Sequence, residues 1–271
     1  MPTSTAPETF TTSDNRTIAF TRHPAGPGAP RLALVHSLAL DRSIWDGVID
    51  RLRGDAEIVA LDCRGHGQSD RRAGAFTAEL FGRDVAELLD HVGWKTATVA
   101  GCSMGGCVAQ AVAGLYPDRV ASLALIDTTA WYGDDAPARF RERAAAAREK
   151  GMAGLTDFQV TRWFSDRFRA EQPETVRRYA DVFLANDFDC YASACALLGD
   201  ADLRRFLPAM QMPVAIVVGE EDYATPVAMS EHLHANIPQS SLTVLPKGRH
   251  LTPVECPDAI AAAIRPLLTR A

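Results

Sequence analysis

Six short runs of aliphatic and β-branched residues recur along the chain, and helical patterns fill most of the intervals between them. Such runs are typical of strands covered on both faces, and their alternation with helices predicts a parallel sheet with helices on both sides. Two polar/apolar alternations near the start, at residues 8–12 and 17–22, predict a hairpin. The later strands are predicted at residues 31–35, 57–61, 96–100, 121–126, 213–218 and 241–245. The pattern therefore predicts an α/β fold with one mostly parallel sheet.

A long stretch between the sixth and seventh predicted strands, residues 128–208, has no strand pattern and is rich in arginine, alanine and aromatic residues. Helices inserted at this point lie over the edge where the parallel strands end, which is where open α/β sheets bind ligands. We therefore expect a helical lid over residues 131–208 and a core made of residues 1–130 and 209–271. The core helices are predicted at residues 76–92, 104–115 and 256–268.

The composition argues against several classes of protein. The 271 residues carry a formal net charge of −6, without the basic stripe of a nucleic-acid-binding protein. The apolar runs are too short to span a bilayer, and the start lacks the pattern of a secretory signal, which predicts a cytoplasmic protein. The six cysteines have no CxxC spacing, so free thiols are expected, and no His/Cys cluster has metal-site spacing. We expect no metal, no cofactor, no nucleic-acid partner and no membrane contact.

A G-x-S-x-G sequence spans residues 101–105, directly after a predicted strand and before a predicted helix. The motif is short enough to occur by chance, but this strand–turn–helix context is the one in which its serine acts as a nucleophile. Glycines are needed because side chains at a sharp turn would collide with the neighbouring strand or helix. We predict Ser103 as the nucleophile; the alternative is a glycine-rich turn with a bystander serine.

A serine hydroxyl needs a general base, and His250 has the best position of the seven histidines. It follows the last predicted strand and a short loop, and it precedes the last helix. That position places it at the same edge of the sheet as Ser103. His36 and His66 are predicted at this edge as well, whereas the other histidines fall on helices or in the N-terminal segment.

The base needs an orienting acid, and Asp222 follows the strand that precedes the one leading to His250. This gives the chain order serine, aspartate, histidine. The two glutamates before Asp222 are adjacent alternatives, and Asp127, at the end of the sixth predicted strand, is the second geometric candidate. Two backbone donors are needed for the oxyanion, and we choose the N–H groups of Met104, which follows the nucleophile, and of Leu38, in the loop after the third strand.

The nucleophile turn, base and acid together resemble the α/β-hydrolase superfamily, and the resemblance covers nearly the whole chain. Residues 62–70 are similar to the D-x-R-G-x-G-x-S loop of that family, and residues 117–120 are similar to its P-x-R-V link. The resemblance implies an eight-stranded, mostly parallel sheet with a helical lid inserted after the sixth strand. It also implies a Ser-His-Asp hydrolase, since dehalogenases and epoxide hydrolases carry an aspartate in place of the serine.

Within the superfamily the chain looks most like the 3-oxoadipate enol-lactone hydrolases. Residues 36–45 keep the S-L, the Asp and the Trp of the N-S-L-G-x-D-x-x-x-W common in that group. Residues 162–164 resemble its R-W-F, and residues 189–203 resemble its G-Y-x-x-x-C-x-A…D-x-D stretch. The chain departs from the pattern at His36, where the group has Asn, and at Ala39, where it has Gly.

The resemblance implies hydrolysis of a small-molecule carboxylic ester or lactone, with 3-oxoadipate enol-lactone as the candidate substrate. Such a lactone carries a free carboxylate, which Arg162 can meet bidentately; the alternative is a surface arginine. Trp131 and Trp163 are further candidates for contact with the substrate in the lid. A general carboxylesterase, a cofactor-free perhydrolase and a carbon–carbon bond hydrolase remain alternatives, as does a non-catalytic ligand receptor on the same fold.

Overall fold

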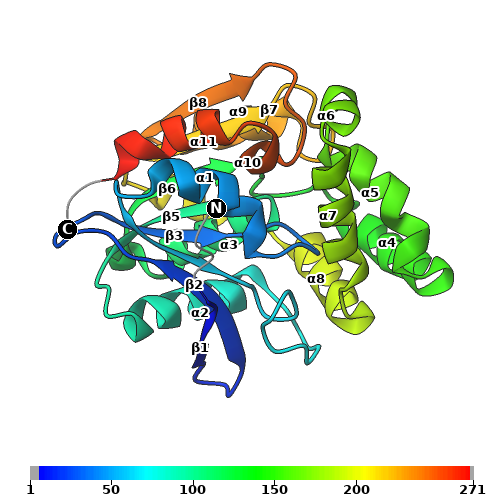
Figure 1. Cartoon of the computed structure of the whole chain (residues 1–271), viewed down its shortest axis with the longest axis horizontal. Coiled ribbons are helices and arrows are strands. Elements are labelled where there is room, and N and C mark those ends of the chain that lie inside the picture. Colours follow the sequence, from blue (N-terminus) through cyan, green and yellow to red (C-terminus); the bar gives the residue numbers. More distant parts are fainter. Residues whose placement is uncertain (1–5, 269–271) are drawn as a thin grey trace.

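The computed structural model describes residues 6–268, and its centre is one eight-stranded sheet (Figure 1). The strand order is β1-β2-β4-β3-β5-β6-β7-β8; β2 pairs antiparallel with β1 and β4, and the other neighbouring strands pair in parallel. The strands are β1 (Glu8–Thr11), β2 (Thr17–His23), β3 (Arg31–Val35), β4 (Glu57–Leu61), β5 (Ala97–Cys102), β6 (Val120–Ile126), β7 (Val214–Gly219) and β8 (Ser240–Leu245). The predicted mostly parallel sheet is confirmed.

Helices cover both faces of the sheet and form an insertion after β6, as predicted (Figure 1). The core helices are α1 (Asp46–Leu52), α2 (Ala78–His91), α3 (Met104–Leu115), α9 (Val227–Asn236), α10 (Thr252–Glu255) and α11 (Pro257–Ile264). The inserted helices are α4 (Ala136–Lys150), α5 (Thr156–Trp163), α6 (Asp166–Glu171), α7 (Pro173–Leu184) and α8 (Phe188–Asp200). They gather at one side of the sheet (Figure 1). None of the helices between residues 6 and 268 is long and apolar enough to cross a bilayer.

The element boundaries differ from the prediction where local chemistry intervenes. β5 continues two residues beyond the predicted end at 100, because Gly101 and Cys102 keep pairing with β6. α2 begins at Ala78, since the side chain of Thr77 caps the helix by accepting a hydrogen bond from Leu80 N–H. The final α-helix ends at Ile264 rather than 268, and Pro266 lies in the short 3₁₀ helix that follows. Residues 1–5 and 269–271 of the predicted core lie outside the described residues.

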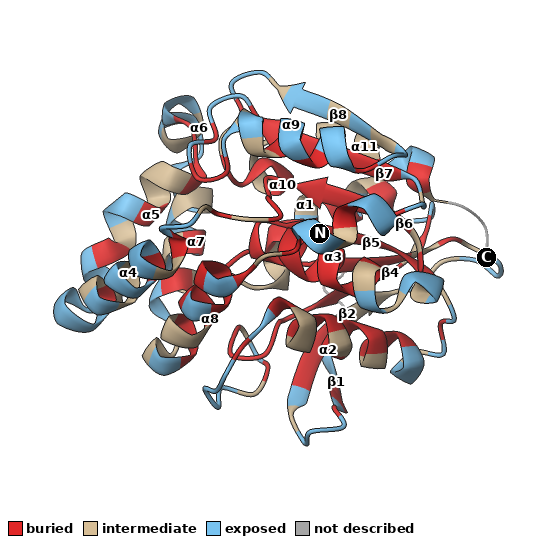
Figure 2. Cartoon of the chain, turned by 180° about the vertical axis from the view of Figure 1, so that it is seen from behind, coloured by how far each residue is buried: buried red, intermediate tan, exposed pale blue. Residues whose placement is uncertain are grey.

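The parallel strands place several loops at one edge of the sheet. Residues at the carboxyl ends of β3, β5 and β6 are direct neighbours: Val35 pairs with Gly101, and Cys102 pairs with Ile126. Nearly all of α3 is buried, and it packs against β3, β5 and β6. Figure 2 shows buried residues concentrated in the sheet and on the inner sides of the helices. The loops that follow β3, β5, β7 and β8 therefore meet beneath the inserted helices.

Candidate active site

Ser103 occupies the sharp turn between β5 and α3, and its φ of 54° and ψ of −114° are rarely adopted by a residue with a side chain. The flanking glycines permit this turn. A Cβ on Gly101 would lie 2.0 Å from the carbonyl oxygen of Gly105, and a Cβ on Gly105 would lie 2.2 Å from the carbonyl oxygen of Val35. The backbone can therefore present the Ser103 side chain at the sheet edge only with glycine at both positions.

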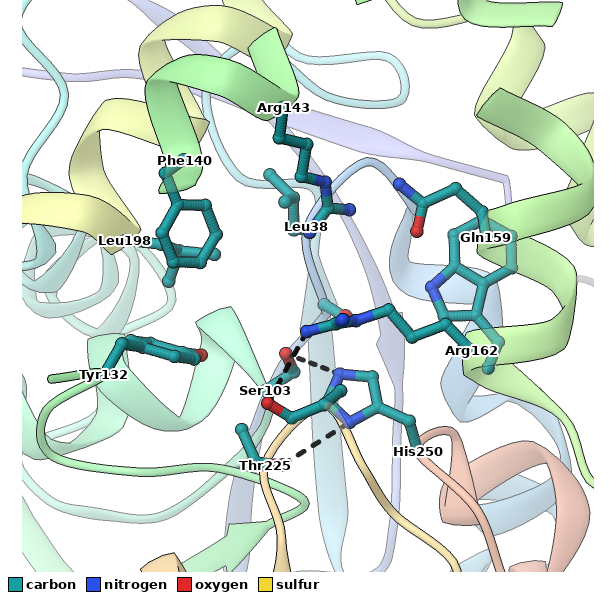
Figure 3. Close-up of a pocket in the computed structure, with 13 residues that line it drawn as sticks. Leu38, Ser103, Tyr132, Phe140, Arg143, Gln159, Arg162, Leu198, Thr225 and His250 are labelled. Atoms are coloured by element: carbon teal, nitrogen blue, oxygen red, sulfur yellow. Dashed lines mark hydrogen bonds between the residues drawn. The ribbon is translucent and has the colours of Figure 1, made fainter. Parts of the chain in front are cut away.

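The structure brings the three predicted residues into one hydrogen-bonded chain. His250 Nε2 lies 2.9 Å from Ser103 Oγ (Figure 3), and His250 Nδ1 lies 2.8 Å from Asp222 Oδ2. Burial by itself would raise the pKa of Asp222, but the adjacent His250 and hydrogen bonds from Thr225 hold it below its ordinary value. An ionised carboxylate only accepts, so Nδ1–H donates to it, and Nε2 is left to accept the Ser103 hydroxyl proton.

Asp127, the second candidate acid, has a different role in the structure. Its Oδ1 accepts the N–H of Gly219 at 3.1 Å, and its Oδ2 accepts the N–H and hydroxyl of Thr252 at 3.0 and 2.7 Å. Asp127 thus connects β7 to the start of α10. The acid that reaches His250 is Asp222.

A narrow cavity of about 20 Å³, called the inner cavity below, lies over Ser103 and His250. Of the residues predicted from the sequence, Leu38, Arg162 and Trp163 line it, whereas Trp131 does not. Trp131 instead pairs with Asp202, and its ring lies 3.9 Å from the guanidinium of Arg204. The other lining residues are Ser37, Tyr132, Phe140, Arg143, Gln159, Leu198, Ala224 and Thr225.

Residues 30–257 match the model of the family described as alpha/beta hydrolase fold. The chain belongs to this family. The assignment confirms the predicted superfamily, so the chain is an α/β-hydrolase. Among the residues that the structure describes, no group of three or more His, Cys, Asp or Glu side chains is arranged to hold a metal ion. All six cysteines are free, as predicted.

The α/β-hydrolase is similar over nearly its whole length to enol-lactonases and to an esterase. It is 32% identical to 3-oxoadipate enol-lactonase 2 of Acinetobacter baylyi, over 89% of each chain. The enol-lactonase from Burkholderia xenovorans has a TM-score of 0.91 and 29% identity, covering 96% of this chain and 99% of that one. A thermophilic esterase from Thermogutta terrifontis with malate bound has a TM-score of 0.89 and 29% identity, covering 97% and 100%.

Arg143 and Gln159 are among the lining residues that were not predicted from the sequence. Arg143 lies on α4 between Phe140 and Ala147, on the same stripe as these buried residues. Gln159 is fully buried on α5, one turn before Trp163, and its Oε1 has no hydrogen-bond partner among the described residues. A polar residue on the buried stripe of a lid helix was the available signal in both cases.

The two arginines of the cavity carry positive charge close to Ser103, and Figure 3 shows both side chains directed toward the space above it. Arg143 Nε donates to the Tyr191 hydroxyl at 2.8 Å, and an Arg162 nitrogen donates to the Ala224 carbonyl at 3.5 Å. Within the described residues, neither guanidinium has a carboxylate in ion-pair contact. Burial and the charge of Arg143 lower the pKa of Arg162. The cavity is therefore suited to an anionic group.

His36 and His66 do not reach Ser103; His36 connects the loop after β3 to the loop after β4, and His66 packs against it. His36 Nε2 accepts the N–H of Cys63 at 2.9 Å, so its Nδ1 carries the proton and donates to the Ser37 carbonyl at 2.7 Å. The two rings lie 5.1 Å apart. Burial lowers the pKa of His36 to about 4, and burial together with the His36 charge lowers the pKa of His66 to about 3. Both rings are therefore neutral in the folded protein near pH 7.

Replacing His36 with asparagine is expected to reduce the loss of stability in acid. The pKa of His36 is about 4 when folded against 6.5 unfolded, so the unfolded chain binds more protons between these values, and stability falls as pH falls through that window. Asparagine can also accept from Cys63 N–H and donate to the Ser37 carbonyl, without titrating.

Urea unfolding at pH 7 and at about pH 4.5 measures this effect, and the acid-induced loss should shrink by on the order of 2 kcal/mol in His36→Asn. His232→Asn, at an exposed position on α9, is the matched control and should lose stability as the wild type does. An equal loss in His36→Asn and wild type would show that His36 is not responsible.

Proposed function

We propose that this α/β-hydrolase cleaves a carboxylic ester or lactone through an acyl-enzyme formed on Ser103. The observation that carries the proposal is the hydrogen-bonded chain from Ser103 through His250 to Asp222, in which His250 lies 2.9 Å from Ser103 Oγ and 2.8 Å from Asp222 Oδ2. A serine hydroxyl becomes an effective nucleophile when an oriented base accepts its proton.

In the proposed reaction, His250 Nε2 takes the hydroxyl proton as Ser103 Oγ attacks the carbonyl carbon. Asp222 stabilises the imidazolium, which then gives the proton to the leaving oxygen. The N–H groups of Met104 and Leu38 are the proposed donors to the oxyanion. Met104 is the first residue of α3, where a helix has no internal acceptor for its N–H, and Leu38 lines the cavity. A water activated by His250 releases the acid and restores Ser103.

We propose 3-oxoadipate enol-lactone as the substrate, with residues 131–208 acting as the lid that supplies the contacts to its carboxylate. Arg162 and Arg143 line the cavity together with Ser103, and the buried Gln159, whose Oε1 has no partner among the described residues, lies in the same lining. A planar guanidinium pairs with a carboxylate through two parallel hydrogen bonds. The named enol-lactonase relatives and the malate-bound esterase support this choice over a neutral ester.

The proposal predicts that Arg162→Ala selectively weakens the use of an anionic substrate. Loss of a charge-assisted contact should raise KM for 3-oxoadipate enol-lactone roughly 10- to 100-fold, whereas KM for uncharged p-nitrophenyl acetate should stay within about twofold. Steady-state kinetics with both substrates measure the difference. Arg141→Ala, an exposed arginine on α4, is the matched control and should change neither value.

The same panel tests the wider proposal when wild-type protein is included. Faster turnover of neutral p-nitrophenyl esters than of the lactone would favour a general carboxylesterase. Cleavage of a vinylogous diketone would favour a carbon–carbon bond hydrolase. An equal rise of KM for lactone and neutral ester in Arg162→Ala would remove Arg162 from carboxylate recognition.

A further inference from the structure

The cavity over Ser103 is too small for any ester substrate as it stands. Its volume of about 20 Å³ is room for an ordered water rather than for a lactone. Pockets that hold small-molecule ligands have volumes of roughly 300–1,000 Å³. Some part of the cavity wall therefore has to move before a substrate reaches Ser103.

A second cavity of about 360 Å³ lies on the lid between α4 and α5. It shares Phe140, Arg143 and Arg162 with the inner cavity over Ser103, so these three side chains form the wall between the two spaces. α4 packs against α8, whereas α5 packs against α7, so this second cavity lies between two helix pairs of the lid. We call this space the outer cavity.

The backbone of α5 is joined to the loop that carries His250. The N–H groups of His250 and Leu251 both donate to the carbonyl of Trp163, at 3.2 and 3.0 Å. The guanidinium of Arg249 donates to the carbonyls of Thr161 and Phe164, at 3.0 and 3.2 Å. A shift of the end of α5 would therefore displace His250 from Ser103.

The side chains of the shared wall are less constrained than this backbone. Arg162 makes one long hydrogen bond of 3.5 Å, to the Ala224 carbonyl, and Arg143 makes one of 2.8 Å, to the Tyr191 hydroxyl. Phe140 contacts Tyr132 edge-on, with ring centroids 5.3 Å apart. These three side chains can change rotamer without moving the hydrogen-bonded end of α5.

We propose that a carboxylate-bearing ester or lactone binds first in the outer cavity and reaches Ser103 when Phe140, Arg143 and Arg162 rotate aside; this inference rests on the proposed function. The outer cavity suits a small anion with an apolar body. Three of its lining residues are arginines and one is a glutamate, and Phe158, with 48% of its surface exposed, contributes an apolar wall. A carboxylate drawn to Arg143 and Arg162 from outside would then remain in contact with the same guanidinium groups inside.

Two adjacent alanines on α4 allow a matched test. Ala146 lines the outer cavity but not the inner one, whereas Ala145 is exposed and lines neither. Ala146→Trp should slow covalent labelling of Ser103 by a fluorophosphonate, followed by mass spectrometry, by roughly tenfold or more. Ala145→Trp should label within about twofold of the wild-type rate. The kcat/KM for 3-oxoadipate enol-lactone should likewise fall in Ala146→Trp and stay near the wild-type value in Ala145→Trp.

Two single-cysteine variants test the same path in protein that has already folded. Ala146→Cys and Ala145→Cys are treated with a bulky maleimide, with maleimide-treated wild type as the control for the native cysteines. Labelling of Ser103 should slow only in modified Ala146→Cys. If Ser103 is labelled at the wild-type rate both in modified Ala146→Cys and in Ala146→Trp, the outer cavity is not the path to Ser103. Failure of untreated wild type to react at Ser103 would instead overturn the proposed function, and the inference with it.

Discussion

Replacing Ser103 with alanine is expected to lower kcat for ester or lactone hydrolysis by roughly 10⁴- to 10⁶-fold. The hydroxyl oxygen is the proposed nucleophile, and alanine offers nothing that can form the acyl-enzyme. Residual turnover above the rate in water is expected, because the proposed oxyanion donors of Met104 and Leu38 are backbone groups that the substitution leaves in place.

The fold should tolerate this substitution. Ser103 already holds a Cβ at φ 54°, so alanine adds no atom to the turn, and the side-chain hydrogen bond lost is the one to His250. Thermal unfolding should therefore give a Tm close to that of the wild type. Ser241→Ala, an exposed serine on β8, is the control and should keep full activity. Unchanged hydrolysis in Ser103→Ala would exclude Ser103 as the nucleophile.

The parts of the structure that the sequence predicted are those set by local chemistry. β3 and β4 have the predicted bounds because their apolar runs are bounded by polar residues or proline, and α3 has its predicted bounds because Pro117 follows it closely. The meeting of Ser103, Asp222 and His250 was predictable because parallel strands bring their carboxyl ends to one edge of a sheet.

The lining of the cavity was only partly predictable, since it depends on how the lid helices pack. Arg143 faces Ser103 because α4 lies on α8, and nothing local to α4 indicates that contact. Trp131 is an aromatic residue of the insertion and was expected at the substrate, yet its pairing with Asp202 keeps it outside the cavity. Hydrophobic periodicity indicates which face of a helix is buried, but it does not indicate which neighbour buries it.

Asp222→Asn tests whether Asp222 or Asp127 is the acid that orients His250. This substitution is expected to lower kcat by roughly 10⁴-fold. Asp222 Oδ1 accepts the N–H groups of Ala224 and Thr225, at 2.7 and 3.0 Å, so the carbonyl oxygen of asparagine takes that place. Its NH₂ group then faces His250 Nδ1 and donates to it. The imidazole proton moves to Nε2, which can no longer accept the proton of Ser103.

Asp127→Asn is the matched substitution, because it makes the same chemical change in the second candidate acid, which is also buried at the sheet edge. Both oxygens of Asp127 accept hydrogen bonds, so an amide NH₂ would oppose the N–H of Gly219 or of Thr252. The expected cost is about 1–3 kcal/mol of stability, with kcat within about tenfold of the wild type. Unfolding curves and kcat for both variants separate the roles. The assignment of Asp222 fails if Asp127→Asn loses the activity and Asp222→Asn keeps it, because the tautomer of His250 would then be fixed by the other carboxyl.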